Sequence, residues 1–463
     1  MNVIVILTDS YRWDHLGHNG NSWIKTPNLD AFSKECAIFD NCYTDNLPTL
    51  PQRTTAFTGR FSFPFRAWES MAPEDDRFAL ELYSKGIYTA MIFDSFPFFS
   101  METGFTDGFQ YSEMIRGYGT IPWKKKHKEV DIDDIIPKYF AEDRVVNQEH
   151  LKHDFLKIQS TFESEGEYSL ARTVNRATTW LDSYDEEEPF MLWLDLFDPH
   201  EPWIVPDEYW KPYADPDYDG ILPATPDYRA EGFHMTPDEA KCCQAMYAGN
   251  CTFVDKYVGK LFDFLRKKDM MDDTMIIYTS DHGEPLGPGP HGHGLYRKFR
   301  PFPYEELAHV PLLVRNPSGA AAGKRLDTFV QTNDITVSIL DAFNVAPTEK
   351  MNGISLLPVM HGEKDKIRDF AFACHNVMGK SRSIRTLEWT YIYWPQHRRD
   401  LQGSHFEERP PELYRRDKDL TEQNNVIADY PEIAQQLELK IRLFEDRLLE
   451  DEHPETLWED RPR

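Results

Sequence analysis

Apolar strands alternate with helical segments along most of this chain, and this alternation restricts the fold more than any other feature of the sequence. Continuous apolar runs rich in β-branched residues occupy residues 3–7, 86–93, 189–194, 274–279 and 310–315. Such runs are typical of strands that are covered on both faces. Helical patterns follow at residues 168–184, 236–267 and 334–343. The alternation predicts an α/β fold with a parallel sheet and helices on both of its faces.

The sequence pattern changes near residue 368. Short β-like pieces appear after this point, and a charged helical pattern closes the chain at about residues 431–449. We therefore predict an α/β catalytic domain over residues 1–367 and a smaller C-terminal α+β subdomain over residues 368–463. Within the first domain, residues 105–170 look like an insertion and residues 203–235 like a long loop. Long loops are often functional, so we expect these two segments to contact the substrate.

The charge of the chain excludes several classes of partner. Its 463 residues carry a formal net charge of −27, which makes it a poor ligand for nucleic acid or an anionic membrane surface. An anionic substrate then needs a local group of cations or a metal ion. The chain has no apolar run of about 18 residues, which predicts that it has no membrane span. Its six cysteines show no CxxC spacing, which predicts reduced thiols in a cytoplasmic protein. The oligomeric state is open, and symmetric homo-oligomers are common among soluble enzymes.

Polar clusters follow three of the predicted strands. They are Asp9-Ser10, the segment from Asp198 to His200, and Asp281-His282. Functional groups gather at the carboxyl ends of strands in open α/β sheets, so we expect these clusters to meet. Two carboxylates, an imidazole and a hydroxyl suit one divalent ion such as Ca²⁺, Mg²⁺ or Mn²⁺. The predicted ligands are Asp9, Thr49, Asp281 and His282.

Thr49 lies between two prolines, in Pro48-Thr49-Leu50-Pro51. This pattern predicts a rigid, non-helical turn, followed by a helix from Arg53 that ends at Gly59. A metal ion lowers the pKa of a bound hydroxyl, so Thr49 is the candidate nucleophile on a phosphoryl or sulfuryl centre. The candidate catalytic residues that bind the anion or protonate the leaving group are Arg53, His200 and Lys298. Taken singly, each of these residues also fits an ordinary turn, helix cap or solvated charge.

Together these motifs resemble the sulfatase branch of the alkaline phosphatase superfamily, in order and over nearly the whole chain. The motifs that carry the resemblance are Thr8-Asp9-Ser10, Thr26-Pro27-Asn28-Leu29-Asp30, the Thr49 turn with Thr58-Gly59-Arg60, Asp198-Pro199-His200-Glu201-Pro202, Ser280-Asp281-His282-Gly283-Glu284, and Glu412-Leu413-Tyr414. The resemblance implies a mixed central sheet flanked by helices, a small C-terminal sheet domain, and a calcium, magnesium or manganese ion at the nucleophile.

The sequence departs from the family pattern at the nucleophile. Sulfatases carry Cys or Ser there and convert it to formylglycine, whereas this chain has Thr49. The β-methyl group of threonine should block the aldehyde, so no formylglycine is expected. Ser10 stands where the family usually has a second aspartate, which related phosphonate monoester hydrolases also lack. Phe93-Asp94-Ser95-Phe96 aligns with a family segment that carries two cationic sulfate contacts, so these contacts are lost and Asp94 is gained. Asp94, His291 and His293 stay open as ligands of a second metal.

Three functions are consistent with these observations. The first is a metal-dependent hydrolase of phosphate, phosphodiester or phosphonate esters with Thr49 as nucleophile. The second is a sulfuric ester hydrolase that works without formylglycine. The third is a catalytically silent binding protein on the sulfatase fold. The expected partner is a small anionic ester in the first two cases, and relative rates on aryl phosphates and aryl sulfates separate them.

Overall fold

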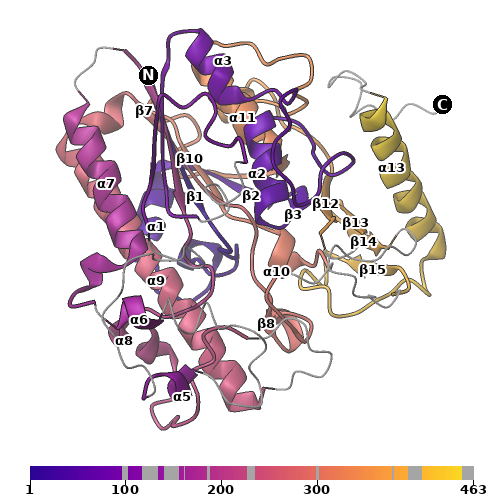
Figure 1. Cartoon of the computed structure of the whole chain (residues 1–463). Helices are drawn as coiled ribbons and strands as arrows, with labels where there is room; N and C mark the ends of the chain where they lie inside the picture. Colours follow the sequence, from indigo (N-terminus) through magenta and orange to yellow (C-terminus); the bar gives the residue numbers. More distant parts are fainter. Residues whose placement is uncertain are drawn as a thin grey trace.

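An eight-stranded sheet forms the centre of the molecule (Figure 1). The structure is a computed structural model and describes residues 1–95, 103–116, 134–139, 156–160, 162–184, 188–226, 235–298, 302–377, 380–394 and 409–450. In spatial order the strands are β11 (Arg325–Gln331), β2 (Ala37–Tyr43), β10 (Leu312–Arg315), β7 (Thr274–Ser280), β1 (Asn2–Thr8), β6 (Phe190–Leu196), β4 (Tyr88–Phe93) and β5 (Tyr111–Met114).

The central sheet is mixed, as the family resemblance implies. β1 pairs in parallel with both β6 and β7, whereas β10 runs antiparallel to β2 and β7. The mixed sheet that the resemblance implies is therefore confirmed, and β10 departs from the parallel sheet that the alternation alone predicts. A parallel return needs a long crossover, usually a helix. Between β7 and β10 the described residues hold only short elements: the hairpin of β8 (Leu286–Gly287) and β9 (Leu295–Tyr296), a 3-10 turn at Gly289–His291 and the one-turn helix α10 (Glu305–Ala308).

Two groups of helices cover the two faces of the sheet because successive strand residues point in opposite directions. Ile4 and Ile6 of β1 pack into a core with α1 (Pro27–Phe32), α7 (Ser169–Ser183) and α9 (Pro237–Lys267). Val3, Val5 and Leu7 pack into a second core with α2 (Thr49–Thr58), α3 (Phe78–Ser84) and α11 (Thr332–Ala342). α7 and α9 confirm two predicted helices, and Thr236 caps α9 by accepting from the backbone N–H of Glu239.

The prediction that Thr49 lies in a non-helical turn is wrong. Thr49 is the first residue of α2, and Pro48 is its N-cap. Proline is tolerated in the first turn of a helix, where its missing N–H has no intrahelical partner, so Pro51 does not stop the helix. The predicted end of the helix is confirmed, because Gly59 adopts a left-handed conformation with φ 63° and closes α2.

A five-stranded sheet and a long helix lie beside the central sheet (Figure 1). The strand order is β15 (Glu412–Arg415), β14 (Trp389–Tyr393), β13 (Ser381–Arg385), β12 (Ala371–His375) and β3 (Asn46–Leu47). α13 (Pro431–Leu449) packs on this sheet through Phe444 and Ile441. The C-terminal α+β part is thus confirmed, but it borrows β3 from the start of the chain. The domain boundary at residue 367 stays a prediction.

The segments expected to contact the substrate are only partly described. Residues 105–170 include β5, α5 (Ile136–Tyr139) and α6 (Leu156–Gln159), and residues 203–235 include α8 (Asp207–Trp210). Residues 117–133, 140–155 and 227–234 lie outside the described residues. The one-turn helix α12 (Leu357–Met360) follows α11 along the chain. In the part of the chain that the structure describes, no helix combines the length and the hydrophobicity needed to cross a membrane.

Candidate active site

The carboxyl ends of β1, β6 and β7 bring the predicted metal ligands together. Thr8 pairs with Ser280 on one side and with Leu196 on the other, so the three strands end at the same level. Asp9 and Asp281 follow directly, and both are fully buried together with His282. One ligand atom of each of these three residues lies within 4.8 Å of the other two. The sequence-based grouping of Asp9, Asp281 and His282 therefore corresponds to one compact cluster.

The donor atoms of this cluster fit a divalent cation. Asp9 Oδ2 is buried and has no hydrogen-bond partner among the described residues, although Arg53 Nη2 lies 3.4 Å away, so this oxygen keeps a lone pair that a metal ion could accept. His282 Nδ1 lies 2.7 Å from the carbonyl oxygen of Gly283 and must donate to it, so Nε2 carries the lone pair. Burial lowers the pKa of His282 to about 3, against the opposing effect of Asp9, so the imidazole is neutral at pH 7. Carboxylate oxygens and a neutral imidazole nitrogen suit Ca²⁺, Mg²⁺ or Mn²⁺.

Thr49 joins this cluster from the start of α2. Its Oγ1 lies 3.3 Å from His282 Nε2, and its side chain is almost completely buried. The hydroxyl also lies at a helix N-terminus, where free N–H groups and the helix dipole favour negative charge. The position is therefore suited to a hydroxyl that loses its proton during a reaction.

Arg53 lies one turn further along α2 and directs its guanidinium at carboxylates. Nε and Nη2 donate to Asp195 Oδ2 and Oδ1 at 3.1 and 2.9 Å. Nη1 donates to Asp281 Oδ2 at 2.6 Å and to the Thr49 carbonyl oxygen at 3.2 Å. Nη2 also lies 3.4 Å from Asp9 Oδ2. The predicted contact of Arg53 with the substrate anion stays a prediction.

Lys298 and His200 are linked by Glu201, which the sequence analysis did not single out. Lys298 Nζ lies 3.2 Å from Glu201 Oε2 and 4.0 Å from Asp9 Oδ1, so its charge lies beside the metal cluster. His200 Nδ1 donates to the Glu201 carbonyl oxygen at 2.5 Å, and burial lowers the pKa of His200 to about 4. Burial alone would raise the pKa of Glu201, but Arg297, His200 and Lys298 together hold that pKa below its usual value.

Replacing Glu201 with glutamine should misplace Lys298 and His200, because Glu201 Oε2 lies 3.2 Å from Lys298 Nζ and 3.3 Å from His200 Nδ1. The change removes the charge that Lys298 faces, and displacement of a catalytic group by about 1 Å costs roughly 100-fold in rate. We expect Glu201→Gln to lower kcat/KM about 10- to 100-fold. The matched control is Glu165→Gln, which breaks the 2.8 Å ion pair of Glu165 with Lys256 of α9. Equal kcat/KM values for Glu201→Gln and wild type would contradict this role.

Glu284 adds a second buried carboxyl group next to Lys298. Its side chain is fully buried, and Lys298 Nζ lies 4.0 Å from Oε2. Burial raises the pKa of Glu284 to about 8, and Lys298 opposes this effect only in part. Glu284 is therefore mostly protonated at pH 7. The sequence shows Glu284 within the Asp281-His282-Gly283-Glu284 motif but gives no signal of its proximity to Lys298.

The small sheet also reaches the site, through His375 at the end of β12. His375 Nε2 donates to the Lys298 carbonyl oxygen at 3.1 Å, and Nδ1 accepts from the Val377 N–H at 3.4 Å. His375 also pairs in register with Leu47 of β3, two residues before Thr49. His375 thereby supports the backbone at Lys298 and, through β3, near Thr49. Nothing in the local sequence around His375 signals this contact.

The buried imidazole of His375 should make the free energy of unfolding depend on pH. Burial lowers its pKa to about 4, well below its value near 6.5 in an unfolded chain. Below pH 6.5 only the unfolded chain binds a proton at His375, so the stability contributed by His375 is lost as the pH falls. The free energy of unfolding of His375→Leu should be lower than wild type at pH 7. This difference should shrink by about 2 kcal/mol at pH 5, measured by urea denaturation. A difference that does not change with pH would contradict this assignment.

The sequence leaves Asp94, His291 and His293 open as ligands of a second metal. In the part of the chain that the structure describes, they are not members of the Asp9, Asp281 and His282 cluster. Asp94 is buried and accepts from the Phe197 N–H at 2.8 Å, next to the loop of His200. His293 Nδ1 lies 2.8 Å from Glu306 Oε1. His291 is exposed, and its carbonyl oxygen accepts from Arg12.

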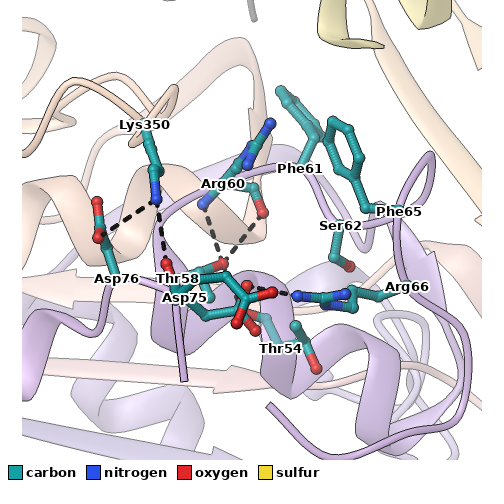
Figure 2. A pocket seen from close by; sticks show the side chains of 11 residues that line it. Thr54, Thr58, Arg60, Phe61, Ser62, Phe65, Arg66, Asp75, Asp76 and Lys350 are labelled. Atoms are coloured by element: carbon teal, nitrogen blue, oxygen red, sulfur yellow. Dashed lines mark hydrogen bonds and ion pairs between the residues drawn. The ribbon is translucent and has the colours of Figure 1, made fainter. Parts of the chain in front are cut away.

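A cavity of about 270 Å³ lies along the other end of α2 (Figure 2). Arg66 lies 2.7 Å from Asp75 in this cavity, and Lys350 donates to the Glu74 carbonyl oxygen at 3.1 Å. These two cations are therefore already engaged with neighbouring oxygens. We assign the cavity no part in the reaction.

The comparisons with known proteins agree with this geometry. A family model described as Sulfatase matches residues 1–345, well over half of the chain. The chain belongs to the sulfatase family. A second model, described as the C-terminal part of N-sulphoglucosamine sulphohydrolase, matches residues 291–447. The resemblance stated from the motifs is thus confirmed.

Relatives within the sulfatase family differ in the esters that their names record. An arylsulfatase of Clostridium perfringens is 24% identical over 441 residues, 89% of this chain and 89% of its own. A choline-sulfatase of Rhizobium meliloti is 24% identical over 425 residues, 85% of this chain and 78% of its own. The structure of a phosphonate monoester hydrolase of Agrobacterium radiobacter superposes with a TM-score of 0.73 at 21% identity, covering 97% of this chain and 95% of that one. The family match, together with the arylsulfatase and choline-sulfatase relatives, identifies this chain as an ester hydrolase of the sulfatase family, and the superposed structure shows the shared fold.

Proposed function

We propose that this sulfatase-family protein is a metal-dependent hydrolase of phosphate, phosphodiester or phosphonate esters with Thr49 as its nucleophile. The observation that carries the proposal is the Thr49 hydroxyl, 3.3 Å from His282 Nε2 and at the edge of the Asp9, Asp281 and His282 cluster. A divalent ion held by these three residues would lower the pKa of the hydroxyl and neutralise charge on the ester.

The reaction needs two displacements at phosphorus. In the first, Thr49 gives up its hydroxyl proton to solvent, Oγ1 forms a bond to phosphorus while the bond to the leaving oxygen breaks, and the leaving group takes up a proton. Lys298 would donate that proton or stabilise the phosphoryl oxygens. His200, with its pKa lowered to about 4, would bind these oxygens once the anionic ester favours its protonated form. In the second, water attacks phosphorus and loses one proton, the bond to Thr49 Oγ1 breaks, and Oγ1 takes up a proton to restore the hydroxyl. Arg53 adds a positive charge to the same region.

A sulfuric ester hydrolase that works without formylglycine is the second candidate. The names of the arylsulfatase and choline-sulfatase relatives support this candidate. The chemistry of Thr49 opposes it. A hydrated aldehyde has one hydroxyl to attack and a second to expel sulfate, whereas threonine has only one. The third candidate, a silent binding protein, accounts less well for a buried cluster of three metal-ligand residues beside a buried hydroxyl.

A substrate panel tests the proposal. Purified protein loaded with Mn²⁺ would be assayed on p-nitrophenyl phosphate, bis-p-nitrophenyl phosphate, an aryl phosphonate monoester and p-nitrophenyl sulfate. We expect kcat/KM on at least one phosphorus ester to exceed that on the sulfate at least about 100-fold, a difference of about 2.7 kcal/mol in transition-state free energy. A preference for the sulfate would favour the second candidate, and no turnover of any ester by metal-loaded protein would favour the third.

The remaining parts of the proposal concern partners and location. The strongly acidic chain fits a small anionic ester held by local cations better than nucleic acid or a membrane surface. All six cysteines are buried free thiols, which supports a reducing, cytoplasmic location. A homo-oligomer stays a proposal, and size-exclusion chromatography with light scattering tests it.

A further inference from the structure

A carboxylate lies inside an otherwise apolar strand at the bottom of the site. Every residue of β6 is buried, and Asp195 is the only charged one among them. Its neighbours in the sheet are Leu7 of β1 and Phe93 of β4, which offer apolar side chains. Burying a carboxylate costs several kcal/mol unless it is paired and hydrogen-bonded. Asp195 therefore needs a partner whose contribution offsets that cost.

Arg53 is this partner, in a bidentate arrangement. Both carboxylate oxygens of Asp195 accept from Arg53, at 3.1 and 2.9 Å, and Trp193 Nε1 lies 3.3 Å from Oδ2. Such two-point pairing fixes the plane of the guanidinium as well as its position. Neither Asp195 nor Arg53 is exposed to solvent, so salt and water do little to weaken the pair.

The fixed guanidinium then faces two of the metal ligands. Its Nη1 donates to Asp281 Oδ2 at 2.6 Å, and its Nη2 lies 3.4 Å from Asp9 Oδ2. A guanidinium has five N–H donors, and those of Arg53 are shared among Asp195, the two ligands and the Thr49 carbonyl oxygen.

A cation so close to two metal ligands competes with a metal ion for their charge. If Arg53 were the only other charged group, the two carboxylates of Asp9 and Asp281 and the guanidinium would together present one net negative charge to a divalent ion. Asp195 supplies a second one and holds Nε and one Nη2 proton of Arg53 on its own side. Without Asp195, the guanidinium would be free to turn fully onto Asp9 and Asp281.

We propose that Asp195 is a positioning residue that retains Arg53 and thereby keeps Asp9 and Asp281 available to the divalent ion. Asp195 touches neither substrate nor metal and acts through Arg53. The proposal rests on the metal centre of the proposed function, but not on the identity of the ester.

Isothermal titration calorimetry with Mn²⁺ tests this role without any turnover. Asp195→Asn keeps the shape of the side chain and removes its charge. We expect the Mn²⁺ dissociation constant to rise about 10- to 100-fold, the usual range for residues that support metal ligands. The matched control is Asp45→Asn. Asp45 is as deeply buried as Asp195, and its carboxylate accepts a hydrogen bond at 2.8 Å from Thr55, which lies on α2 like Arg53. Its Mn²⁺ affinity should stay within about twofold of wild type.

A second pair of variants separates an effect through Arg53 from a direct effect of charge. Arg53→Gln and the double variant Arg53→Gln with Asp195→Asn should bind Mn²⁺ with affinities within about threefold of each other, because Asp195 has no guanidinium left to retain. The double variant also leaves no unpaired buried charge, so it can be measured even if Asp195→Asn alone fails to fold by circular dichroism.

Two results would overturn the role of Asp195. One is a Mn²⁺ affinity of Asp195→Asn equal to wild type. The other is a further tenfold loss in the double variant relative to Arg53→Gln. Wild-type protein that binds Mn²⁺ but hydrolyses no ester would refute the proposed function and leave this comparison intact. Wild-type protein that binds no Mn²⁺ would overturn both.

Discussion

Thr49→Ala should lose at least about 1,000-fold in kcat on the best phosphorus ester, while Thr49→Ser should stay within about tenfold of wild type. Alanine removes the hydroxyl that lies 3.3 Å from His282 Nε2, whereas serine keeps the oxygen and removes only the methyl group. Removing a nucleophile leaves only binding and electrostatic stabilisation of the transition state. Steady-state kinetics of the three proteins with saturating Mn²⁺ give the measurement.

The control for Thr49→Ala is a threonine of the same helix outside the site. Thr54 donates to the Leu50 carbonyl oxygen at 3.0 Å and is buried to a similar degree. Thr54→Ala should keep kcat within about threefold of wild type, although it removes one hydrogen bond. Full activity of Thr49→Ala would show that Thr49 is not the nucleophile.

Removal of the metal ion should abolish turnover and lower the stability of the fold. The cluster of Asp9, Asp281 and His282 is fully buried, and Asp9 Oδ2 has no hydrogen-bond partner among the described residues, so a divalent ion would satisfy an oxygen that the ion pair with Arg53 leaves without a hydrogen bond. Dialysis against a chelator should reduce kcat to background, and added Mn²⁺ should restore it. At a metal concentration of 100 times the dissociation constant, binding adds about 2.7 kcal/mol to the free energy of unfolding. Thermal unfolding with and without Mn²⁺ measures this gain.

Asp281→Asn distinguishes a metal effect from a general effect of the chelator. The variant removes the charge of one ligand and should lose both the activity and the stabilisation by Mn²⁺. Its thermal midpoint should no longer depend on Mn²⁺ concentration. Turnover by chelated wild-type protein at the original rate would contradict the account of the metal centre.

Most of the central sheet could be predicted because its strands are continuous apolar runs. β1, β4, β6 and β7 are short, buried on both faces and rich in apolar residues, so their composition alone distinguishes them. β2 could not be recognised in this way because Asp40 and Asn41 interrupt its apolar pattern. The direction of β10 depends on the path of the chain between β7 and β10, which local composition does not encode. β3 has only two residues and is held by β12, far along the chain.

The residues of the site also fall into two groups, those whose meeting the sequence could predict and those whose contacts it could not. Asp9, Asp281 and His282 follow strands that end at one level, so their meeting follows from the topology. Asp195, Glu201 and His375 gain their roles from partners distant in sequence, such as Arg53 and Lys298. The one local signal among these three is the charged residue inside an apolar strand at Asp195, because a buried charge requires a partner. No comparable signal marks His375.

A rapid acid-quench experiment tests the central claim most directly. Excess enzyme loaded with Mn²⁺ would be mixed with the best phosphorus ester, quenched over milliseconds, digested and analysed by peptide mass spectrometry. The account predicts that the peptide containing Thr49 carries an unmodified threonine in the resting enzyme and a transient phosphoryl or phosphonyl group on Thr49 during turnover. Product formation without any adduct on Thr49 at any time point, or an oxidised Thr49 in the resting enzyme, would contradict it.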